Sequence, residues 1–350
     1  MSKKFSLFLI VCVGFYLAFI HRSRELPLSV VKEGVSVIDE IVDVSLSDFR
    51  PYNPGVIFLG DRYLLVTRAK ASNLWQYLKL KLQGKRRNVI MVTELDENFA
   101  QVEKMVQLLP QKEDGMTKVT DPRLFWHNGE IYMIFCDHTH GGSVQTLAKL
   151  QKKEGVWEAT NILPLFYEYC FSNYVEKGIE KNWMPFSKEG KLYVVYLLEP
   201  ENVVLEVNLE KGNCILVSKT ENGLLNKFSP LRGGTPPVFD EELGEYLTLY
   251  HIAFAGRNSF TTLKKNIYIC GAATFTKNAP FILTGRTMTP FYQKNLYNNR
   301  EKIVFPTALL RKGDDYLMFY GEDDCRIKVA KINRAKLIAH MQRREDEKGK

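Results

Sequence analysis

Charged and polar residues occupy matching places in five separate segments of the 350-residue chain. Asn53 and Asp121 each stand directly before a proline that opens an apolar stretch, and Lys181 stands shortly before another such proline. Arg68 and His251 close the first and the fourth of these segments. Carboxylates accept hydrogen bonds from sugar hydroxyls, whereas Arg, Lys and His bind phosphate oxygens. The set predicts a site for a polyhydroxylated or phosphorylated ligand, provided that the fold brings its members together.

Other residues of the same kinds flank these positions: Arg123, Asp137, His138, Asn182, Arg232, Asp323 and Asp324. Each candidate also has an interpretation without chemistry. Asp121 with its proline could be only the start of a turn, His251 could be a core histidine bonded to the backbone, and Asp324 could be a loop acid. The residue types alone leave these alternatives open.

The run 137–140, Asp-His-Thr-His, has residue types that bind metals, but the two glycines after it are typical of a loop. The sequence has no G-x-S-x-G, H-E-x-x-H, P-loop or G-x-G-x-x-G motif. It also has no D-x-D in its body, which argues against a metal-dependent nucleotide-sugar transferase. We therefore expect neither a metal nor a cofactor.

A pattern of two strands joined by a polar turn with glycine recurs five times. The copies span 53–69, 121–136, 184–197, 235–251 and 305–321, and a third strand is expected after each, at 88–96, 144–151, 203–210, 266–275 and 326–333. One such sheet is too small to be stable alone. Five sheets arranged radially cover one another's faces, so we predict an all-β, five-bladed β-propeller rather than a two-sheet sandwich. The innermost strands of a propeller start near its axis, where the polar residues would meet.

Six short motifs follow one another through these repeats: NPGVIF leading to YLLVTRA, TDPR, KNWMPF, GGTPPV, YLTLYH, and FPTALL leading to YGEDD. Over about residues 51–331 the chain resembles the five-bladed propellers of glycoside hydrolase family 130, the β-mannoside phosphorylases. It is also similar to the mannosyltransferase-phosphorylases of glycosyltransferase family 108. One departure is Thr120, because the family usually has Glu before its Asp-Pro-Arg.

The resemblance implies a role for each matching residue. Asp121 corresponds to the catalytic acid, which protonates the leaving oxygen by way of a sugar hydroxyl. One carboxylate is enough, because phosphate is its own nucleophile; a hydrolase needs two. The implied mannosyl-binding residues are Asn53, Arg68 and Asp324, with Arg123 beside the acid, and the implied phosphate-binding residues are Lys181, His251 and Arg232.

The N-terminal run 5–20 contains sixteen residues without a charge and has basic residues on both sides. Bulky Phe19 and Ile20 stand where a cleaved signal peptide needs small residues, so we favour an uncleaved signal anchor over a cleaved signal or a core helix. The anchor would place the protein in a bacterial cytoplasmic membrane or in the ER or Golgi membrane. The expected domains are the anchor at 1–24, a stem and first strand at 25–44, the propeller at 45–333, and a charged helix and tail at 334–350.

The net charge of +8 lies mostly in the two ends of the chain, so the body is nearly neutral. This distribution argues against nucleic-acid binding. The stretch 68–92 is locally basic, and it is interpreted as a solvated loop, a phosphate-facing lid or a contact with anionic lipid. The six cysteines are scattered and are interpreted as free thiols.

These observations predict a membrane-anchored enzyme that transfers a mannosyl unit, forming or phosphorolysing β-mannosidic bonds with inversion. The donor would be mannose 1-phosphate or a nucleotide-mannose, and the acceptor a glycan. Two alternatives stay open. One is a β-mannoside hydrolase of the same fold, with Asp137 or Asp323 as the second carboxylate. The other is a non-catalytic glycan-binding propeller on a membrane stalk.

Overall fold

The computed structural model describes residues 37–44, 46, 50–70, 88–109, 119–138, 143–167, 180–221, 231–257, 264–287 and 302–344. The predicted anchor at 5–20, the stem up to residue 36 and the part 71–87 of the basic stretch lie outside these residues. Within the described ranges, no helix has the length and apolar character of a membrane span. The anchor and the basic lid therefore stay predictions.

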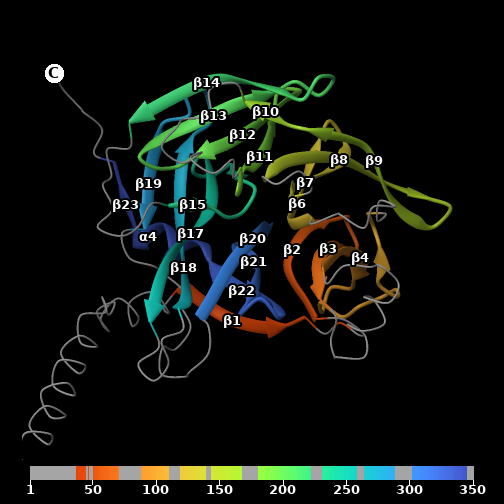
Figure 1. Ribbon diagram of the computed structural model, residues 1–350. Coiled ribbons are helices and arrows are strands. Elements are labelled where there is room, and N and C mark those ends of the chain that lie inside the picture. Colours follow the sequence, from red (N-terminus) through yellow and green to blue (C-terminus); the bar gives the residue numbers. More distant parts are fainter. Residues whose placement is uncertain are drawn as a thin grey trace, which may run out of the picture.

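The first two blades contain four antiparallel strands each, in the spatial order of the sequence. Blade 1 consists of β2 (Arg50–Phe58), β3 (Tyr63–Lys70), β4 (Asn88–Leu95) and β5 (Val106–Gln107). Blade 2 consists of β6 (Val119–His127), β7 (Glu130–Asp137), β8 (Val144–Lys153) and β9 (Val156–Pro164). Figure 1 shows the two blades side by side, with β2 and β6 as their innermost strands.

Blade 3 consists of β11 (Met184–Lys188), β12 (Lys191–Leu197), β13 (Glu201–Val207) and β14 (Asn213–Glu221), with β10 (Phe166–Tyr167) added parallel to β14. In blade 4, β15 (Arg232–Gly233) and β16 (Val238–Asp240) both pair with β17 (Glu245–Arg257), which pairs with β18 (Lys264–Thr276) and then β19 (Leu283–Thr287). Blade 5 consists of β20 (Lys302–Lys312), β21 (Asp315–Glu322) and β22 (Arg326–Asn333). A two-residue parallel contact between β18 and β20 joins blades 4 and 5.

A tight turn at one end of the propeller axis sets the register of the β6–β7 hairpin. His127 pairs with Glu130, so only Asn128 and Gly129 form the loop between β6 and β7. Both have positive φ, 50° and 76°. A two-residue hairpin loop of type I′ needs this geometry at both positions, and Asn-Gly is its preferred sequence. The turn therefore holds β6 in a fixed register, and with it the residues at the opposite end of that strand.

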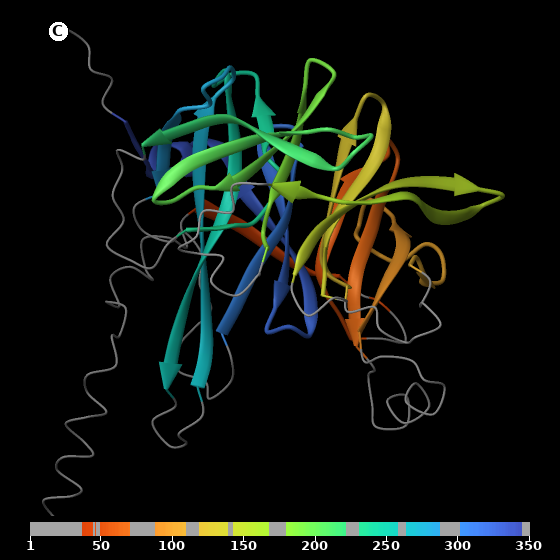
Figure 2. The same cartoon turned by 45° about the horizontal axis from the view of Figure 1, so that its top comes forward.

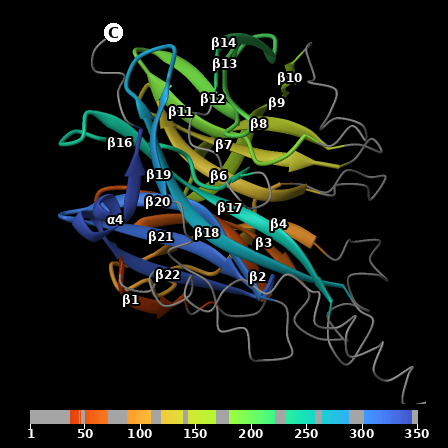
Figure 3. The same cartoon turned by 90° about the vertical axis from the view of Figure 1, so that its left-hand side faces the viewer.

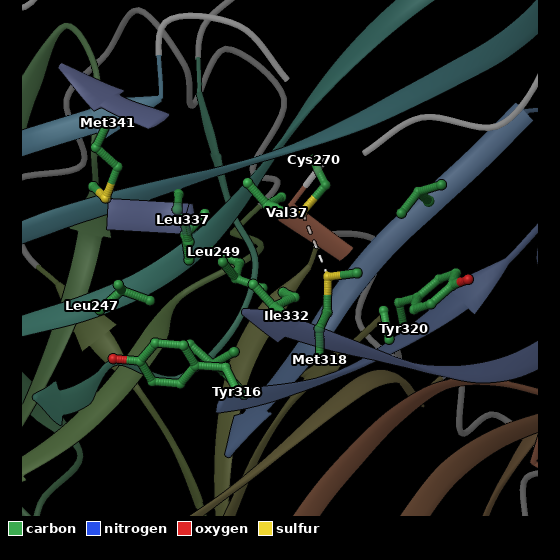
Figure 4. Close-up of a cluster of buried hydrophobic side chains, with 14 residues drawn as sticks. Val37, Leu247, Leu249, Cys270, Tyr316, Met318, Tyr320, Ile332, Leu337 and Met341 are labelled. Atoms are coloured by element: carbon green, nitrogen blue, oxygen red, sulfur yellow. Dashed lines mark hydrogen bonds between the residues drawn. The ribbon is translucent and has the colours of Figure 1, made fainter. Parts of the chain in front are cut away.

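The hydrophobic core is divided into layers between neighbouring blades. Ile57 and Leu64 of blade 1 pack with Leu124 and Met133 of blade 2. Equivalent clusters lie between blades 2 and 3, 3 and 4, and 4 and 5, and Figure 4 shows the last of these. A fifth cluster joins Phe319 of blade 5 back to blade 1. The five layers close a ring, which is the arrangement expected of a five-bladed propeller and not of a sandwich.

The ring is closed by a strand from the N-terminal side. β1 (Ile38–Asp43) pairs antiparallel with β22 and becomes the outer strand of blade 5, as Figure 3 shows. At the other end of the sequence, α4 (Arg334–His340) leads into β23 (Met341–Arg343), which pairs with β19 in blade 4. The sheets thus extend beyond the expected limits of 45 and 333 at both ends, because both terminal segments supply outer strands.

Candidate functional site

Asn53 and Asp121 adopt the same unusual backbone conformation at the starts of adjacent inner strands. Their φ angles are 52° and 56°, and each lies in a β-bulge, between Tyr52 and Pro54 in one case and between Thr120 and Arg123 in the other. A left-handed conformation is uncommon for a residue with a side chain and is disfavoured before proline. Strain of this kind persists where the surroundings impose it, and it concentrates at functional sites. Side chains along a strand normally point to alternating faces of the sheet, and a bulge interrupts this pattern. The bulges therefore change the directions in which the Asn53 and Asp121 side chains point.

The two bulged residues meet across the gap between blades 1 and 2. Asn53 Nδ2 donates a 2.8 Å hydrogen bond to Asp121 Oδ1. Arg68 Nη1 lies 3.9 Å from the same oxygen, and its guanidinium sits over the Tyr52 ring at 4.8 Å from the centroid. About a fifth of the Asp121 and Arg68 side chains is exposed. The carboxylate therefore faces solvent while an amide and a cation hold one of its oxygens.

Blade 5 completes this side of the site. Gly321 on β21 packs against Asn53 so closely that a Cβ atom there would lie 2.1 Å from Asn53 Oδ1. Asp324 follows shortly after, with φ 51°, and its charge acts on the Tyr52 hydroxyl together with those of Asp121 and Arg68. Burial is the main reason that the pKa of Tyr52 is raised well above its usual value, so Tyr52 stays neutral. Of the implied mannosyl-binding residues, Asn53 and Arg68 thus lie against Asp121, and the charge of Asp324 acts on the neighbouring Tyr52.

Arg123 has a different position from the one expected of a substrate-binding residue. Its side chain is 1% exposed, and it donates from Nε to Gly234 O at 2.5 Å, from Nη1 to Asp121 O at 3.3 Å and from Nη2 to Asn182 Oδ1 at 3.3 Å. These acceptors belong to three different blades. Arg123 therefore connects the Asp121 bulge to blades 3 and 4 through hydrogen bonds made by one buried guanidinium. Burial lowers the pKa of Arg123 to about 10, which leaves it charged at neutral pH.

His251 lies on β17, directly opposite Arg232 in the sheet. It is 1% exposed, it contacts the Phe305 ring edge-on at 4.7 Å between centroids, and among the residues that the structure describes its Nδ1 has no hydrogen-bond partner. Burial, followed by the charges of Arg232 and Arg123, lowers the pKa of His251 well below its usual value. The imidazole is neutral, and its neighbour in the sheet, Arg232, is exposed. Beyond His251, the β17–β18 hairpin extends past the other strands, as Figure 2 shows.

Lys181 is exposed and lies just before β11, at the start of blade 3. Close packing brings it toward blade 4, because a Cβ atom on Gly233 would fall 2.0 Å from Asn182 O. The charges of Lys181 and Asp121 both act on Cys136 and on His138. Lys181 and Asp121 therefore share the neighbours Cys136 and His138, while Arg232 pairs with His251 in blade 4.

The two candidates for a second carboxylate differ in their surroundings. Asp323 accepts a hydrogen bond from Ile303 N at 3.1 Å, and its own N–H donates to Ile303 O. These bonds give Asp323 a role in holding the turn after β21. Asp137 ends β7 and is partly buried beside His138. Among the residues that the structure describes, no three His, Cys, Asp or Glu side chains gather as a metal site requires; Thr139 and His140 lie outside them.

Two residues beside Asn53 and Asp121 were given no role from the sequence. Tyr52 carries Arg68 on its ring, and its only sequence signal is that it precedes Asn53. Thr120 stands out as the departure from the family motif, and its Oγ1 lies 3.1 Å from His138 Nε2. Neither the ring contact nor the hydrogen bond can be read from residue spacing, because both join side chains from different strands.

The opposite end of the propeller axis is apolar. A cavity of about 260 Å³ lies between the far ends of the five inner strands, lined by Ile57, Trp126, Phe186, Ser187, Phe239 and Leu309 among others. Trp126 is five residues beyond Asp121 on β6, which corresponds to about 16 Å along a strand. The cavity is therefore separate from the Asp121 site and has none of its charged residues.

Comparison with known proteins agrees with this geometry. A family model described as beta-1,4-mannooligosaccharide phosphorylase, of glycoside hydrolase family 130, matches residues 35–343. No curated protein gives a significant match.

Solved structures share the fold at low sequence identity. The β-1,2-mannobiose phosphorylase of Listeria innocua is 16% identical with a TM-score of 0.57, over 85% of this chain and 94% of its own. A mannose phosphorylase from Leishmania mexicana, in complex with a phosphate ion, is 12% identical with a TM-score of 0.54, over 88% and 92%. A putative glycoside hydrolase from Parabacteroides distasonis is 17% identical with a TM-score of 0.58, over 83% and 88%.

At these identities the structures establish only that the fold is shared, whereas the family model covers almost the whole described chain. Five blades, their order and the matched range all agree with the resemblance seen in the motifs. The chain belongs to glycoside hydrolase family 130, the family of β-mannoside phosphorylases.

Proposed function

We propose that this protein transfers a mannosyl unit between a β-mannoside and phosphate, with Asp121 as the general acid and base. The observation that carries the proposal is the position of Asp121. Its carboxylate is fixed by Asn53 at 2.8 Å and faced by Arg68 at 3.9 Å, and the charge of Lys181 acts on two groups, Cys136 and His138, on which the charge of Asp121 also acts. A single positioned carboxylate beside a basic set suits a reaction in which phosphate supplies the nucleophile.

In the phosphorolytic direction, a phosphate oxygen forms a bond to the anomeric carbon as the glycosidic C–O bond breaks. Asp121 gives a proton to a hydroxyl of the bound sugar, which passes its own proton to the leaving oxygen. Attack from the face opposite the leaving group inverts the anomeric centre. In the synthetic direction the same steps reverse, and Asp121 removes the proton of the acceptor.

The remaining residues stabilise charge and hold the sugar. Lys181 and Arg232 are exposed cations suited to phosphate oxygens. Asn53, Arg68 and Asp324 offer donors and acceptors to sugar hydroxyls around Asp121. Because Arg123 and His251 are almost fully buried, they act by holding this layer in place. Catalysis then rests on positioning and on electrostatic stabilisation as the sugar becomes oxocarbenium-like.

The decisive experiment supplies the purified protein with β-1,2- and β-1,4-manno-oligosaccharides, with and without phosphate. We expect mannose 1-phosphate to form only when phosphate is present, and manno-oligosaccharides to lengthen when mannose 1-phosphate is the donor. GDP-mannose serves as the alternative donor. Loss of both reactions in Asp121→Asn is required. Absence of any product from the wild-type protein, with every donor, would refute the proposal.

Hydrolysis is the second candidate. One structural neighbour, 13% identical with a TM-score of 0.60, represents a family of mannoside phosphorylases that contains glycoside hydrolases targeting β-1,2-mannosidic linkages in Candida mannan. A hydrolase needs a second carboxylate to activate water, at about 6.5–9.5 Å from the acid in an inverting enzyme, and Asp137 is the remaining candidate. Release of free mannose in phosphate-free buffer, abolished by Asp137→Asn, would favour hydrolysis.

We also propose that residues 5–20 anchor the protein in a membrane, which fits a synthetic role on glycans more closely than a degradative one. The support is the uncharged apolar run with basic residues on both sides. Fractionation of cells that express the full chain, with a carbonate wash, should leave the protein in the membrane pellet. A protein that starts at residue 25 should move to the supernatant.

A further inference from the structure

The residue that departs from the family motif has a partner. Thr120 directly precedes Asp121 at the start of β6, and its Oγ1 lies 3.1 Å from Nε2 of His138, which directly follows the end of β7. Thr120 is 6% exposed and His138 is half-buried. The imidazole therefore touches the bulge that turns Asp121 toward the site.

The other side of the same imidazole leads to Lys181. His138 Nδ1 lies 2.7 Å from Ser143 Oγ, and the backbone carbonyl of Ser143 accepts a hydrogen bond from Glu180 N at 3.0 Å. Glu180 is the residue before Lys181. A continuous chain of contacts thus runs from the Asp121 bulge, through His138 and Ser143, to the residue beside the implied phosphate-binding lysine.

Both imidazole nitrogens of His138 have hydrogen-bonding neighbours. Burial raises the pKa of Cys136 to about 11, so it is a thiol, and its S–H points to Glu180 O at 3.4 Å. Its sulfur, 3.4 Å from His138 Nε2, then serves as an acceptor. One arrangement that satisfies these contacts has the proton on Nε2, with Thr120 and Cys136 as acceptors, and Nδ1 accepting from the Ser143 hydroxyl.

Charges of both signs act on the pKa of His138. Burial is the main cause that lowers its pKa; Lys181 and Arg68 lower it further, while Asp121 and Asp137 act in the opposite direction. The ring is neutral at pH 7. A neutral ring adds no third cation beside Lys181 and Arg68, and it still keeps a donor on one side and an acceptor on the other.

We propose that His138 is a positioning residue of the mannosyl-transfer site. Through Thr120 on one side and Ser143 on the other, it fixes the Asp121 bulge relative to Lys181, and so sets the gap in which the sugar and the phosphate react. This inference rests on the proposed function. It assigns a role to the residue pair 120 and 138 that the family motif does not contain, because the family usually has Glu at the position of Thr120.

The chain offers a matched control at the far end of the same hairpin. His127 is also buried, its Nδ1 lies 2.9 Å from Ser187 Oγ, and burial lowers its pKa in the same way. It lies six residues along β6 from Asp121, which corresponds to about 20 Å along a strand. Replacing His127 therefore removes an equivalent His–Ser pair without touching the link to Lys181.

The first test is a double-mutant cycle on wild-type, Thr120→Val, His138→Ala and the double variant, measured as kcat for mannose 1-phosphate formation. We expect each single change to lower kcat about 10- to 100-fold, since a misplacement of about 1 Å has this effect, and the double variant to be no slower than the slower single one. His138→Gln keeps a donor near Thr120 and should recover part of the rate. His127→Gln should keep the wild-type kcat.

Additive effects of the two single changes would overturn the inference, and so would a folded His138→Ala variant with wild-type kcat. If His127→Gln lowers kcat as much as His138→Ala, loss of a buried His–Ser pair affects the whole propeller and the specific role is refuted. Circular dichroism and thermal unfolding confirm that each variant is folded before its rate is compared.

The second test does not depend on activity. Titration of the histidine side chains by nuclear magnetic resonance should show the pKa of His138 rising in Lys181→Met and falling in Asp121→Asn, while that of His127 stays constant. Should the wild-type protein prove inactive with every mannoside, the proposed function fails, and these shifts still decide whether His138 links the two residues. Unchanged His138 values in both variants would refute the link.

Discussion

The two ends of the β6–β7 hairpin contain similar residues in opposite circumstances. At one end, Asp121 sits in a strained bulge before a proline, next to a half-buried histidine and several charges. At the other end, the Asn128–Gly129 turn adopts positive φ angles that suit its residues, and a buried histidine contacts Ser187 beside an apolar cavity. Under the proposed function the strained end carries the chemistry, and the tight turn at the relaxed end fixes the register of the two strands.

The difference is also one of charge. Asp121 and Lys181 lie at the starts of inner strands, with Arg68 on the neighbouring strand β3, whereas apolar side chains such as Trp126 lie at the other end of the axis. Conformational strain costs free energy, so it persists where the surroundings impose it and concentrates at functional sites. This contrast predicts that substitutions at the first end change activity more than stability, and that substitutions at the second end do the reverse.

The largest effect is expected for Asp121→Asn. The amide cannot transfer the proton, so kcat should fall by about 10²- to 10⁴-fold, while the Asn53 contact can re-form and stability should change little. Initial rates of mannose 1-phosphate formation measure the change. A Ser187→Ala variant, at the opposite end, serves as the control and should retain the wild-type rate. A fully active Asp121→Asn enzyme would contradict the assignment of catalysis to the Asp121 end of the hairpin.

The next effect compares two glycines. Alanine at Gly321 places a Cβ atom 2.1 Å from Asn53 Oδ1, so it must push Asn53 away from Asp121. We expect a loss of about 1–3 kcal/mol in unfolding free energy, from overpacking, together with a loss of activity of about 10-fold or more.

Gly313 provides the matched variant, because it has φ 58° and open space around it. Gly313→Ala should lower stability through backbone strain alone and leave kcat unchanged. Denaturant unfolding and kcat, measured on both variants, separate the two effects. Equal activity losses in the two alanine variants would contradict the assignment of Asn53 to the site.

The next prediction concerns the dependence of stability on acid pH, through the buried carboxylate of Asp240. Asp240 is fully buried; burial opposes its ionisation, but hydrogen bonds from Arg334 and Tyr316 outweigh this and hold its pKa well below its usual value. Since the folded pKa is depressed, the stabilisation is present above the unfolded pKa near 4 and is lost as the pH falls below it.

Arg334→Gln removes two of these contacts, at 2.6 and 2.8 Å. It should lower the unfolding free energy at pH 7 by about 1–3 kcal/mol and flatten the loss of stability between pH 5 and 3. Urea unfolding across this range checks the slope. An unchanged pH dependence in the variant would show that Asp240 does not contribute to acid unfolding, and kcat at pH 7 should match the wild type.

The smallest effect is expected for Trp126→Ala. Trp126 is 44% exposed and lines the cavity at the far end of β6, so its removal should change the unfolding free energy by about 1 kcal/mol and leave kcat unchanged. Thermal unfolding and initial rates measure both quantities. A clear fall in kcat would mean that the two ends of β6 are coupled more strongly than the comparison assumes.

Much of the fold could be predicted from local sequence signals. The five repeats predicted the inner hairpins, because a turn residue such as Gly129 and the alternation around it act over a few neighbouring residues. The terminal strands β1 and β23 were not predicted as parts of the blades, because their pairing partners β22 and β19 are distant in the sequence. Pairing of this kind depends on which edge is left open once the ring has formed.

The same distinction between local sequence signals and long-range packing applies to the candidate site. The sequence by itself determined which residue types stand at the starts of the inner strands: Asn53, Asp121 and Lys181 were identified from their spacing to proline. Only the tertiary structure decided the surroundings of each candidate residue. It buried Arg123 and His251 beneath the site and brought His138 into contact with Thr120, because exposure and hydrogen bonding depend on how the blades pack, and packing joins residues that the sequence keeps far apart.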